Sequence, residues 1–166
     1  FPDLIAALAN LGAADPARRC RIRIGSLEPG KCASETLSVM TDHDNVCRFL
    51  HIPIQSMADR LLVAMQRPYR AKDVDELVDA AIHAVPDIGL GCDLMTGFPG
   101  ESDVEFLSTK TFLQRAPFSN VHVFPFSSRP GTVADTLPER IPSEIRSSRA
   151  HKISHDASSA RASFAR

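Results

Sequence analysis

Short apolar runs of strand character alternate with longer segments of helical spacing, and this alternation restricts the fold more than any other feature of the chain. Strands are predicted at residues 21–26, 49–55, 88–95 and 121–126, and helices at residues 34–42, 57–66, 73–85 and 102–115. Successive strands begin roughly 30 to 40 residues apart, about the length of a βαβ unit. The sequence therefore predicts an α/β protein with a parallel sheet and right-handed crossovers.

The two faces of the predicted strands differ in polarity, because successive side chains point to opposite sides of a strand. One face is apolar, as in Leu50, Ile52 and Ile54, and is expected to meet the helices. A closed eight-stranded barrel fills its interior with branched apolar side chains, so a polar inner face predicts a wider lumen that holds ligand and water. The polar residues assigned to this face are Arg21, Arg23, His51, Gln55, Asp93 and His122.

The sequence Gly-Phe-Pro-Gly-Glu at residues 97–101 directly follows the third predicted strand. Pro99 and Gly100 fit the central positions of a type II turn, in which the second residue has positive φ. Ser102 and Glu105 form a capping box that starts the next helix. Ligands gather at the C-terminal ends of parallel strands in α/β proteins, so a site-forming loop is predicted here.

Each polar residue near these strand ends also has a purely structural explanation. A core histidine needs only a hydrogen-bond partner, a buried arginine and aspartate can pair, and a polar residue after a strand can cap the next helix or end the strand. Their convergence on one face and at the strand ends is what favours a cofactor site. The structural alternatives apply in turn to His51 and His122, to Arg23 and Asp93, and to Gln55, Ser56 and Glu28.

Composition limits the possible partners and the cellular setting. The formal net charge of the 166 residues is −1, which gives no overall attraction to nucleic acid, and no apolar run is long enough to span a bilayer. We expect a cytoplasmic protein with no membrane contact. The four cysteines lack zinc-ligand spacing, so we expect no metal ligands in the chain and take the cysteines as small buried hydrophobes.

The ends of the chain suggest a piece of a longer protein. It opens at Phe1 without an initiating methionine and passes directly into a helical pattern. Residues 1–141 are expected to form one α/β unit, and residues 142–166 a peripheral basic helix with few apolar positions. The basic face of this helix is explained either as solvated surface or as a route toward RNA phosphates.

Four motifs occur along the chain in this order: Arg-Ile-Arg-Ile-Gly-Ser-Leu-Glu-Pro at 21–29, His-Ile-Pro-Ile-Gln-Ser at 51–56, Gly-Phe-Pro-Gly-Glu at 97–101 and His-Val-Phe-Pro-Phe-Ser-Ser-Arg-Pro-Gly-Thr at 122–132. Together with Arg-Pro-Tyr at residues 67–69, they resemble in order and spacing the radical S-adenosylmethionine methylthiotransferases. The resemblance covers about residues 4–149, and the fourth motif is most similar to the branch that modifies threonylcarbamoyladenosine at position 37 of tRNA. The isopentenyladenosine branch is the runner-up, and the branch acting on a ribosomal protein is less similar.

The resemblance implies a parallel partial barrel, of which this chain would supply the later four of six strands and a C-terminal helix leading toward an RNA-binding domain. Whole members of the family are expected to carry two [4Fe–4S] clusters, to bind S-adenosylmethionine and tRNA, and to need an electron donor protein. A deoxyadenosyl radical would take hydrogen from the adenine ring before the methylthio group is added. The radical cluster is held by C-x3-C-x2-C, which this sequence lacks, so the ligands of both clusters are expected outside it and the chain alone is expected to be inactive.

The resemblance also implies roles for individual positions. No catalytic residue is assigned within the chain. Met57 departs from the glycine usual after Gln-Ser, and Ser102 replaces the usual threonine while keeping a hydroxyl. The expected S-adenosylmethionine site comprises Gln55, Ser56, Asp93, Gly97, Phe98, Pro99, Gly100 and Glu101, with Arg23, Glu28 and His51 toward its charged or ribose groups, and His122, Phe124, Phe126 and Arg129 are expected on the substrate side.

Two other classes of function fit the same residues. A parallel barrel could host a lyase in which Glu28, His51 and Asp93 act as acids and bases. Alternatively, a half-barrel without catalysis could bind RNA or a partner chain.

Overall fold

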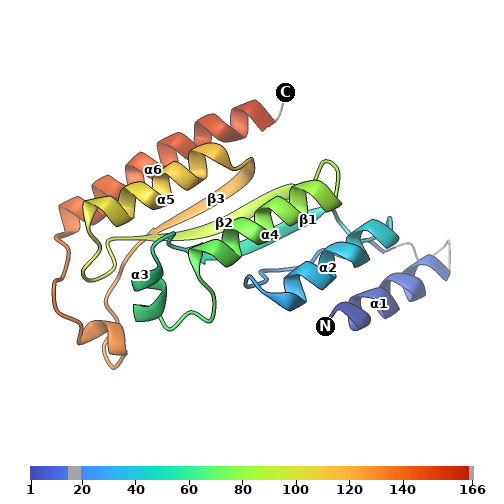
Figure 1. Ribbon diagram of the computed structural model, residues 1–166, viewed down its shortest axis with the longest axis horizontal. Helices are drawn as coiled ribbons and strands as arrows, with labels where there is room; N and C mark the ends of the chain where they lie inside the picture. Colours follow the sequence, from blue (N-terminus) through green and yellow to red (C-terminus); the bar gives the residue numbers. More distant parts are fainter. Residues whose placement is uncertain (15–19, 165–166) are drawn as a thin grey trace.

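The computed structural model describes residues 1–14 and 20–164 and shows an α/β chain built on a parallel sheet (Figure 1). The sheet has the strand order β1-β2-β3, as in a series of βαβ units. The described elements are α1 (Pro2–Ala14), α2 (Lys31–Asp42), β1 (Phe49–Gln55), α3 (Asp59–Ala64), α4 (Ala71–Ala84), β2 (Gly89–Thr96), α5 (Asp103–Arg115), β3 (Phe118–Pro125), the 3-10 turn η2 (Val133–Asp135) and α6 (Ser143–Phe164).

The strand predicted at residues 21–26 is not a regular strand, and this prediction was wrong. The segment lies beside β1 but makes only two isolated parallel bridges, Ile22 with Val46 and Ser26 with His51. The four-residue step from Ile22 to Ser26 is matched to a five-residue step from Val46 to His51, so the two bridges are out of register by one residue. A continuous ladder cannot form across such a slip. The described sheet therefore has three strands.

The apolar face of the sheet is the one covered by helices, as the alternation predicted. Leu50, Ile52 and Ile54 of β1 and Leu90 and Leu94 of β2 are fully buried. Figure 1 shows α4 running along β1 and β2, and α5 and α6 side by side next to β3. The inner, polar face is more open: Phe124 of β3 is 51% exposed.

The helix and strand limits follow the sequence signals closely where a cap or a turn is present. β1 has the predicted limits, and α5 begins after Ser102, whose hydroxyl accepts a hydrogen bond from the Glu105 amide while the Glu105 carboxylate accepts from the Ser102 amide. α2 begins earlier than predicted, at Lys31, and α3 is shorter. The last two residues of the helix predicted to end at Arg166 lie outside the described residues.

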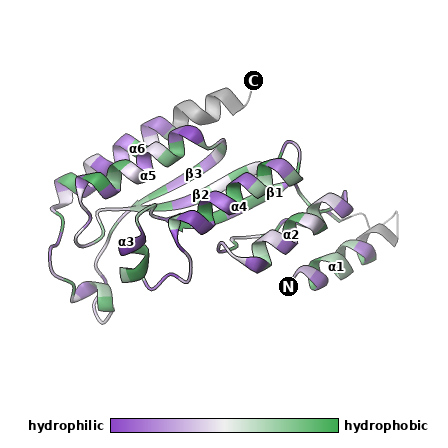
Figure 2. Ribbon diagram, viewed as in Figure 1, coloured by the Kyte–Doolittle hydropathy of each residue, from purple (hydrophilic) through white to green (hydrophobic). Residues whose placement is uncertain are grey.

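α6 is polar for most of its described length, as Figure 2 shows, yet two of its side chains are buried. Ile153 is fully buried in the main core, and Arg149 is 6% exposed. The helix is therefore fastened to the rest of the fold. No helix among the described residues is long and apolar enough to cross a membrane.

The cysteines only partly match the prediction that they are buried hydrophobes. Cys92 on the apolar face of β2 is buried, and this burial raises the pKa of its thiol. Cys20 and Cys32 are exposed, so the prediction was wrong for these two. Neither lies on a buried strand face, and an exposed thiol in a loop or on a helix surface needs no core contact.

Candidate functional site

The loop at residues 97–101 has the conformation that its sequence predicts. Gly100 has a φ of 79°, and the Glu101 amide donates to the Phe98 carbonyl oxygen at 2.9 Å. A positive φ at the third residue of the turn and the closing hydrogen bond are the marks of a type II turn. The loop leaves the C-terminal end of β2 and returns into α5.

The carboxylate of Glu101 points into the protein rather than toward solvent. Its side chain is only 2% exposed, and it accepts hydrogen bonds from the Gly97 amide at 2.7 Å and from Arg149 Nη1 at 2.6 Å. Burial raises the pKa of Glu101, and these two hydrogen bonds oppose the rise. Arg149 also donates to the Glu101 carbonyl oxygen and to Asp103. Glu101 thus fixes the loop to α6.

A second arginine holds the same loop from the opposite side. Arg60 of α3 binds both carboxylate oxygens of Glu105, at 2.8 and 2.7 Å, and donates to the Gly100 carbonyl oxygen at 2.6 Å. This paired geometry is the strong form of an arginine–carboxylate contact. The hydrogen bond from Arg60 lowers the pKa of Glu105 to about 2. The loop is therefore anchored to α3 through Arg60 and to α6 through Arg149.

The sheet brings His51, Asp93 and His122 together in a row across β1, β2 and β3 on the inner face. Asp93 Oδ1 lies 3.0 Å from His51 Nε2 and 3.3 Å from His122 Nδ1. The register explains the arrangement, because Asp93 pairs with His122 and His51 pairs with Gly91, two residues before Asp93 on the same face. We call these three residues the polar row.

Glycine at position 91 is required by this arrangement. A Cβ on Gly91 would lie 2.8 Å from His51 Nδ1 and 2.9 Å from the Phe49 ring. Such contacts are shorter than side-chain packing allows, so Gly91 provides the space in which the His51 ring lies. Sequence reasoning gave Gly91 no role.

Gln55 and Ser56 lie at the C-terminal end of β1, beside a break in the pairing register with β2. Gln55 has a φ of 64°, a left-handed conformation that is unfavourable for a residue with a side chain. The buried Ser56 hydroxyl accepts from the Ala58 amide at 3.2 Å, which stabilises the turn before α3, but Ser56 does not cap this helix because the N-cap residue is Ala58. Met57, the departure from the motif, packs partly buried against the core.

Arg23 and Glu28 do not join the polar row. The Arg23 guanidinium stacks over the Phe49 ring at 4.3 Å, in a depression near the N-terminal ends of the strands that Arg21 and Arg48 also line. The alternative in which Arg23 pairs with Asp93 is therefore absent. Glu28 pairs with Arg67 at 2.5 Å, so the acid–base group of Glu28, His51 and Asp93 that a lyase would need is not assembled.

Tyr69, two residues after Arg67 in the sequence, holds the C-terminal part of β1 in place. Its hydroxyl donates to the Pro53 carbonyl oxygen, and the residue is 1% exposed. Burial raises the pKa of Tyr69 to about 12. The Arg-Pro-Tyr motif thus serves to hold the strand that carries His51.

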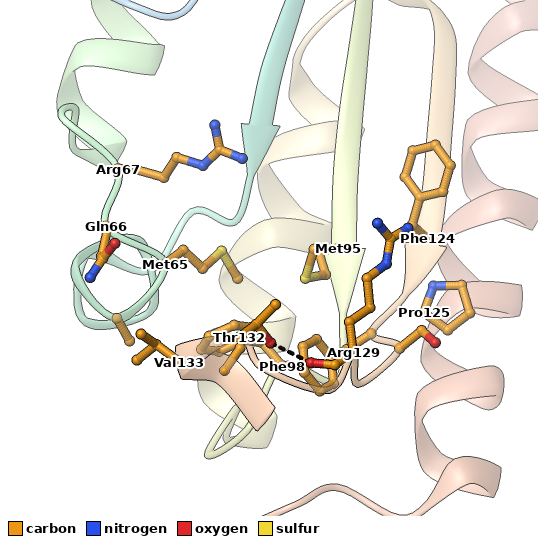
Figure 3. Close-up of a pocket in the computed structure, with 14 residues that line it drawn as sticks. Met65, Gln66, Arg67, Met95, Phe98, Phe124, Pro125, Arg129, Thr132 and Val133 are labelled. Carbon is orange, nitrogen blue, oxygen red and sulfur yellow. Dashed lines mark hydrogen bonds between the residues drawn. The ribbon is translucent and has the colours of Figure 1, made fainter. Parts of the chain in front are cut away.

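A pocket of about 560 Å³ opens at the C-terminal ends of β2 and β3, beside α3 and η2. Figure 3 shows Phe124 and Arg129 on one side of it and Met65 and Arg67 on the other. The volume is in the usual range for small-molecule sites. The lining residues are Ala64, Met65, Gln66, Arg67, Met95, Phe98, Phe124, Pro125, Phe126, Ser127, Arg129, Thr132, Val133 and Ala134.

The walls of this pocket suit a flat, mostly apolar group. The Phe98 and Phe126 rings meet edge to face with centroids 5.3 Å apart, and Met65 and Met95 pack against the same cluster. The pocket is lined by three residues expected on the substrate side, Phe124, Phe126 and Arg129. Phe98, which was expected to contact the cofactor, also lines it. Met65 and Met95 were missed, because methionine at helical or strand spacing is an ordinary core residue.

Comparisons with curated proteins give a consistent set of relatives. The chain is 38% identical over 125 residues to tRNA-2-methylthio-N(6)-dimethylallyladenosine synthase from Mycobacteroides abscessus, which covers 75% of this chain and 25% of that protein. It is 34% identical over 133 residues to the threonylcarbamoyladenosine tRNA methylthiotransferase MtaB from Bacillus subtilis, covering 80% and 30%. The chain thus spans about a quarter to a third of the length of these relatives. No family model matches the chain.

Among solved structures, the fold is similar to that of coproporphyrinogen III oxidase (HemN) from Escherichia coli, described as a radical SAM enzyme. The TM-score is 0.74 at 14% sequence identity, over 96% of this chain and 37% of that one. At this identity the likeness concerns the fold alone. With 34–38% identity over 75–80% of its length, the chain is homologous to one segment of the tRNA methylthiotransferases.

Proposed function

We propose that this chain forms part of the S-adenosylmethionine-binding barrel of an enzyme that adds a methylthio group to C2 of a modified adenosine at position 37 of tRNA. The observation that carries the proposal is the polar row on the open face of a parallel sheet whose C-terminal ends carry the strained Gln55 and the loop at residues 97–101. Backbone strain of this kind is retained mostly where a site requires it.

The residues present suit a cofactor with a charged amino-acid end and an adenosine end. Asp93, 23% exposed, and the two imidazoles offer hydrogen-bond donors and acceptors on the open inner face. The loop at 97–101 offers backbone groups held in place by Arg60 and Arg149. When bound, S-adenosylmethionine supplies the radical and methyl-transfer chemistry of the family. The role of this chain is to bind, orient and shield the cofactor.

The geometry changes the expected roles of some residues. Glu101 and Ser56 contribute by holding the wall in shape, because their polar groups already have partners within the fold. The Arg23 guanidinium stacks on Phe49, in the depression that Arg48 also lines, and does not contact the loop. The remaining cofactor contacts are assigned to His51, Gln55 and Asp93.

We place the modified adenine at the pocket lined by Phe98, Phe124, Phe126 and Arg129. Aromatic and methionine side chains stack well against a flat base, and the Arg129 guanidinium has no carboxylate partner among the described residues. The fourth motif favours threonylcarbamoyladenosine as the substrate, with isopentenyladenosine as the alternative. Relatives named for both nucleosides match the chain.

The ligands of two [4Fe–4S] clusters, the tRNA-binding surface and the docking site of an electron donor are assigned to parts of the whole protein outside this sequence. The sequence has no C-x3-C-x2-C, and the cysteines differ in their exposure to solvent, from exposed Cys20 to buried Cys92. We expect that treating this chain with iron and sulfide yields no stable cluster. A four-iron absorption spectrum at stoichiometric loading would contradict that assignment.

The function is tested by mass analysis of tRNA nucleosides from a strain that lacks the gene. We expect the methylthio form of threonylcarbamoyladenosine to disappear and its unmodified precursor to accumulate. Loss of the isopentenyladenosine derivative instead would select the other branch, and an unchanged nucleoside profile would overturn the function. Complementation with Asp93→Asn should fail, whereas Lys152→Ala, on the exposed side of α6, should restore the modification.

A further inference from the structure

The polar row has the composition of a metal site. It offers one carboxylate oxygen and two imidazole nitrogens, and one ligand atom from each residue lies within 4.8 Å of the other two. The distances of 3.0 and 3.3 Å from Asp93 Oδ1 to the two ring nitrogens match the separation of neighbouring ligands around an ion with bonds of about 2.1 Å. The third pair, the two imidazole nitrogens, lies within 4.8 Å, and the His122 side chain is half exposed.

The groups behind the ligands also fit. Asn120 Nδ2 lies 3.2 Å from His122 Nε2, and a flip of this amide would present its oxygen to the ring instead. A hydrogen bond from Nε2–H to that oxygen holds the tautomer in which Nδ1 is free to bind a metal. His51 is held in place by Phe49 and by the space at Gly91.

The ligand set selects among metals. Imidazole nitrogen with one carboxylate suits Zn²⁺, Co²⁺ and Fe²⁺, whereas Mg²⁺ and Ca²⁺ prefer oxygen ligands. Three protein ligands on an open sheet face leave further coordination positions for water or another small ligand. Sequence spacing gave no sign of this, because the three residues come from three strands and are brought together only by the register.

We propose that His51, Asp93 and His122 bind a single divalent transition-metal ion through two imidazole nitrogens and one carboxylate oxygen. This site goes beyond the proposed function and shares residues with the assigned S-adenosylmethionine contacts. The ion and the cofactor therefore compete for the row, so that metal binding inhibits cofactor binding.

The test is titration of this chain with Co²⁺, followed by absorption in the visible region. We expect one equivalent to bind with d–d bands typical of nitrogen and oxygen ligands, and Zn²⁺ to displace it. The exposed cysteines are the main competing ligands, and a thiolate-to-cobalt charge-transfer band in the near ultraviolet would place the ion on them. A thiolate charge-transfer band that grows in proportion to the bound Co²⁺, or no saturable binding, overturns the proposal.

Variants assign the ion to the row. His122→Ala and Asp93→Asn should each weaken Co²⁺ binding at least tenfold, with an unchanged far-ultraviolet circular dichroism spectrum as the check on folding. His83→Ala is the matched control, because His83 is an exposed histidine on α4 whose Nδ1 contacts only the Asp79 carbonyl. Equal affinity in all three variants would overturn the proposal.

A competition experiment separates this proposal from the proposed function. If Co²⁺ binds to the row and S-adenosylmethionine raises the apparent dissociation constant, both assignments hold. If Co²⁺ binds and the cofactor has no effect on it, the metal site stands and the cofactor assignment to His51 and Asp93 fails.

Discussion

The loop at residues 97–101 and the polar row are held in opposite ways. The buried carboxylate of Glu101 is fully engaged with Gly97 and Arg149, and Arg60 closes the other side of the loop. In the polar row, Asp93 contacts both histidines, and the three side chains are 12% to 51% exposed. The loop therefore has a fixed conformation, whereas the polar groups of the row remain available to bind a ligand.

The largest expected effect comes from removing the anchor of the wall. Arg149→Met leaves the Glu101 carboxylate buried without a cation, and the free energy of unfolding should fall by about 3–5 kcal/mol. Urea denaturation followed by circular dichroism measures this. Lys152→Ala, one turn farther on the exposed face of α6, is the control and should change stability by less than about 0.5 kcal/mol.

A double variant shows whether the loss is due to the stranded charge. Adding Glu101→Gln to Arg149→Met removes the unpaired carboxylate, so part of the lost stability should return. If the double variant is as unstable as the sum of the single ones, the two side chains are not coupled and the wall is held by other contacts.

A smaller effect is expected from the Arg60 side of the loop, and it depends on pH. The pKa of Glu105 is about 2 in the folded chain, below the ordinary value of 4.5. The stabilisation by its charged form is therefore complete above pH 4.5 and is lost as the pH falls toward 2. Glu105→Gln should cost about 1 kcal/mol at pH 7 and make unfolding less dependent on pH in this range.

The contrast with an exposed pair tests the origin of that pH dependence. Glu76 pairs with Lys72 on the surface of α4, and both side chains are more than half exposed. Glu76→Gln should leave the acid unfolding curve almost unchanged. If the two glutamine variants shift the curve equally, the loop glutamate has no special environment.

The smallest effect on stability is expected in the polar row. His122→Ala removes a half-exposed ring whose contact with Asp93 is open to solvent, so the free energy of unfolding should change by about 0.5 kcal/mol or less. The same variant should weaken ligand binding at the row. A loss of stability as large as that of Arg149→Met would show that the row belongs to the scaffold, and would remove the distinction between the two regions.

The sequence predicted the fold where signals are local. The limits of β1 follow from the alternation of Leu50, Ile52 and Ile54, and the start of α5 follows from the capping box of Ser102 and Glu105. The segment at residues 21–26 has the same alternation but is not a regular strand. A one-residue slip against its neighbour is a property of the pairing and leaves no mark on the pattern of one segment.

The candidate site was predictable in part for the same reason. Strand parity placed His51, Asp93 and His122 on one face, but it does not show how far along the sheet each residue lies, and Arg23 stacks on Phe49 at the start of β1. Arg149 was missed because its partner Glu101 is 48 residues away, and its own helix looks polar throughout.

Tyr69 gives this chain an optical property that follows from its position. It is the single tyrosine, and the sequence has no tryptophan, so emission excited near 280 nm comes almost entirely from one buried ring. Its hydroxyl is bonded to the Pro53 carbonyl, two residues beyond His51 on β1. The chain therefore carries an internal fluorophore attached to the strand of the candidate site, and unlabelled protein suffices to follow changes there.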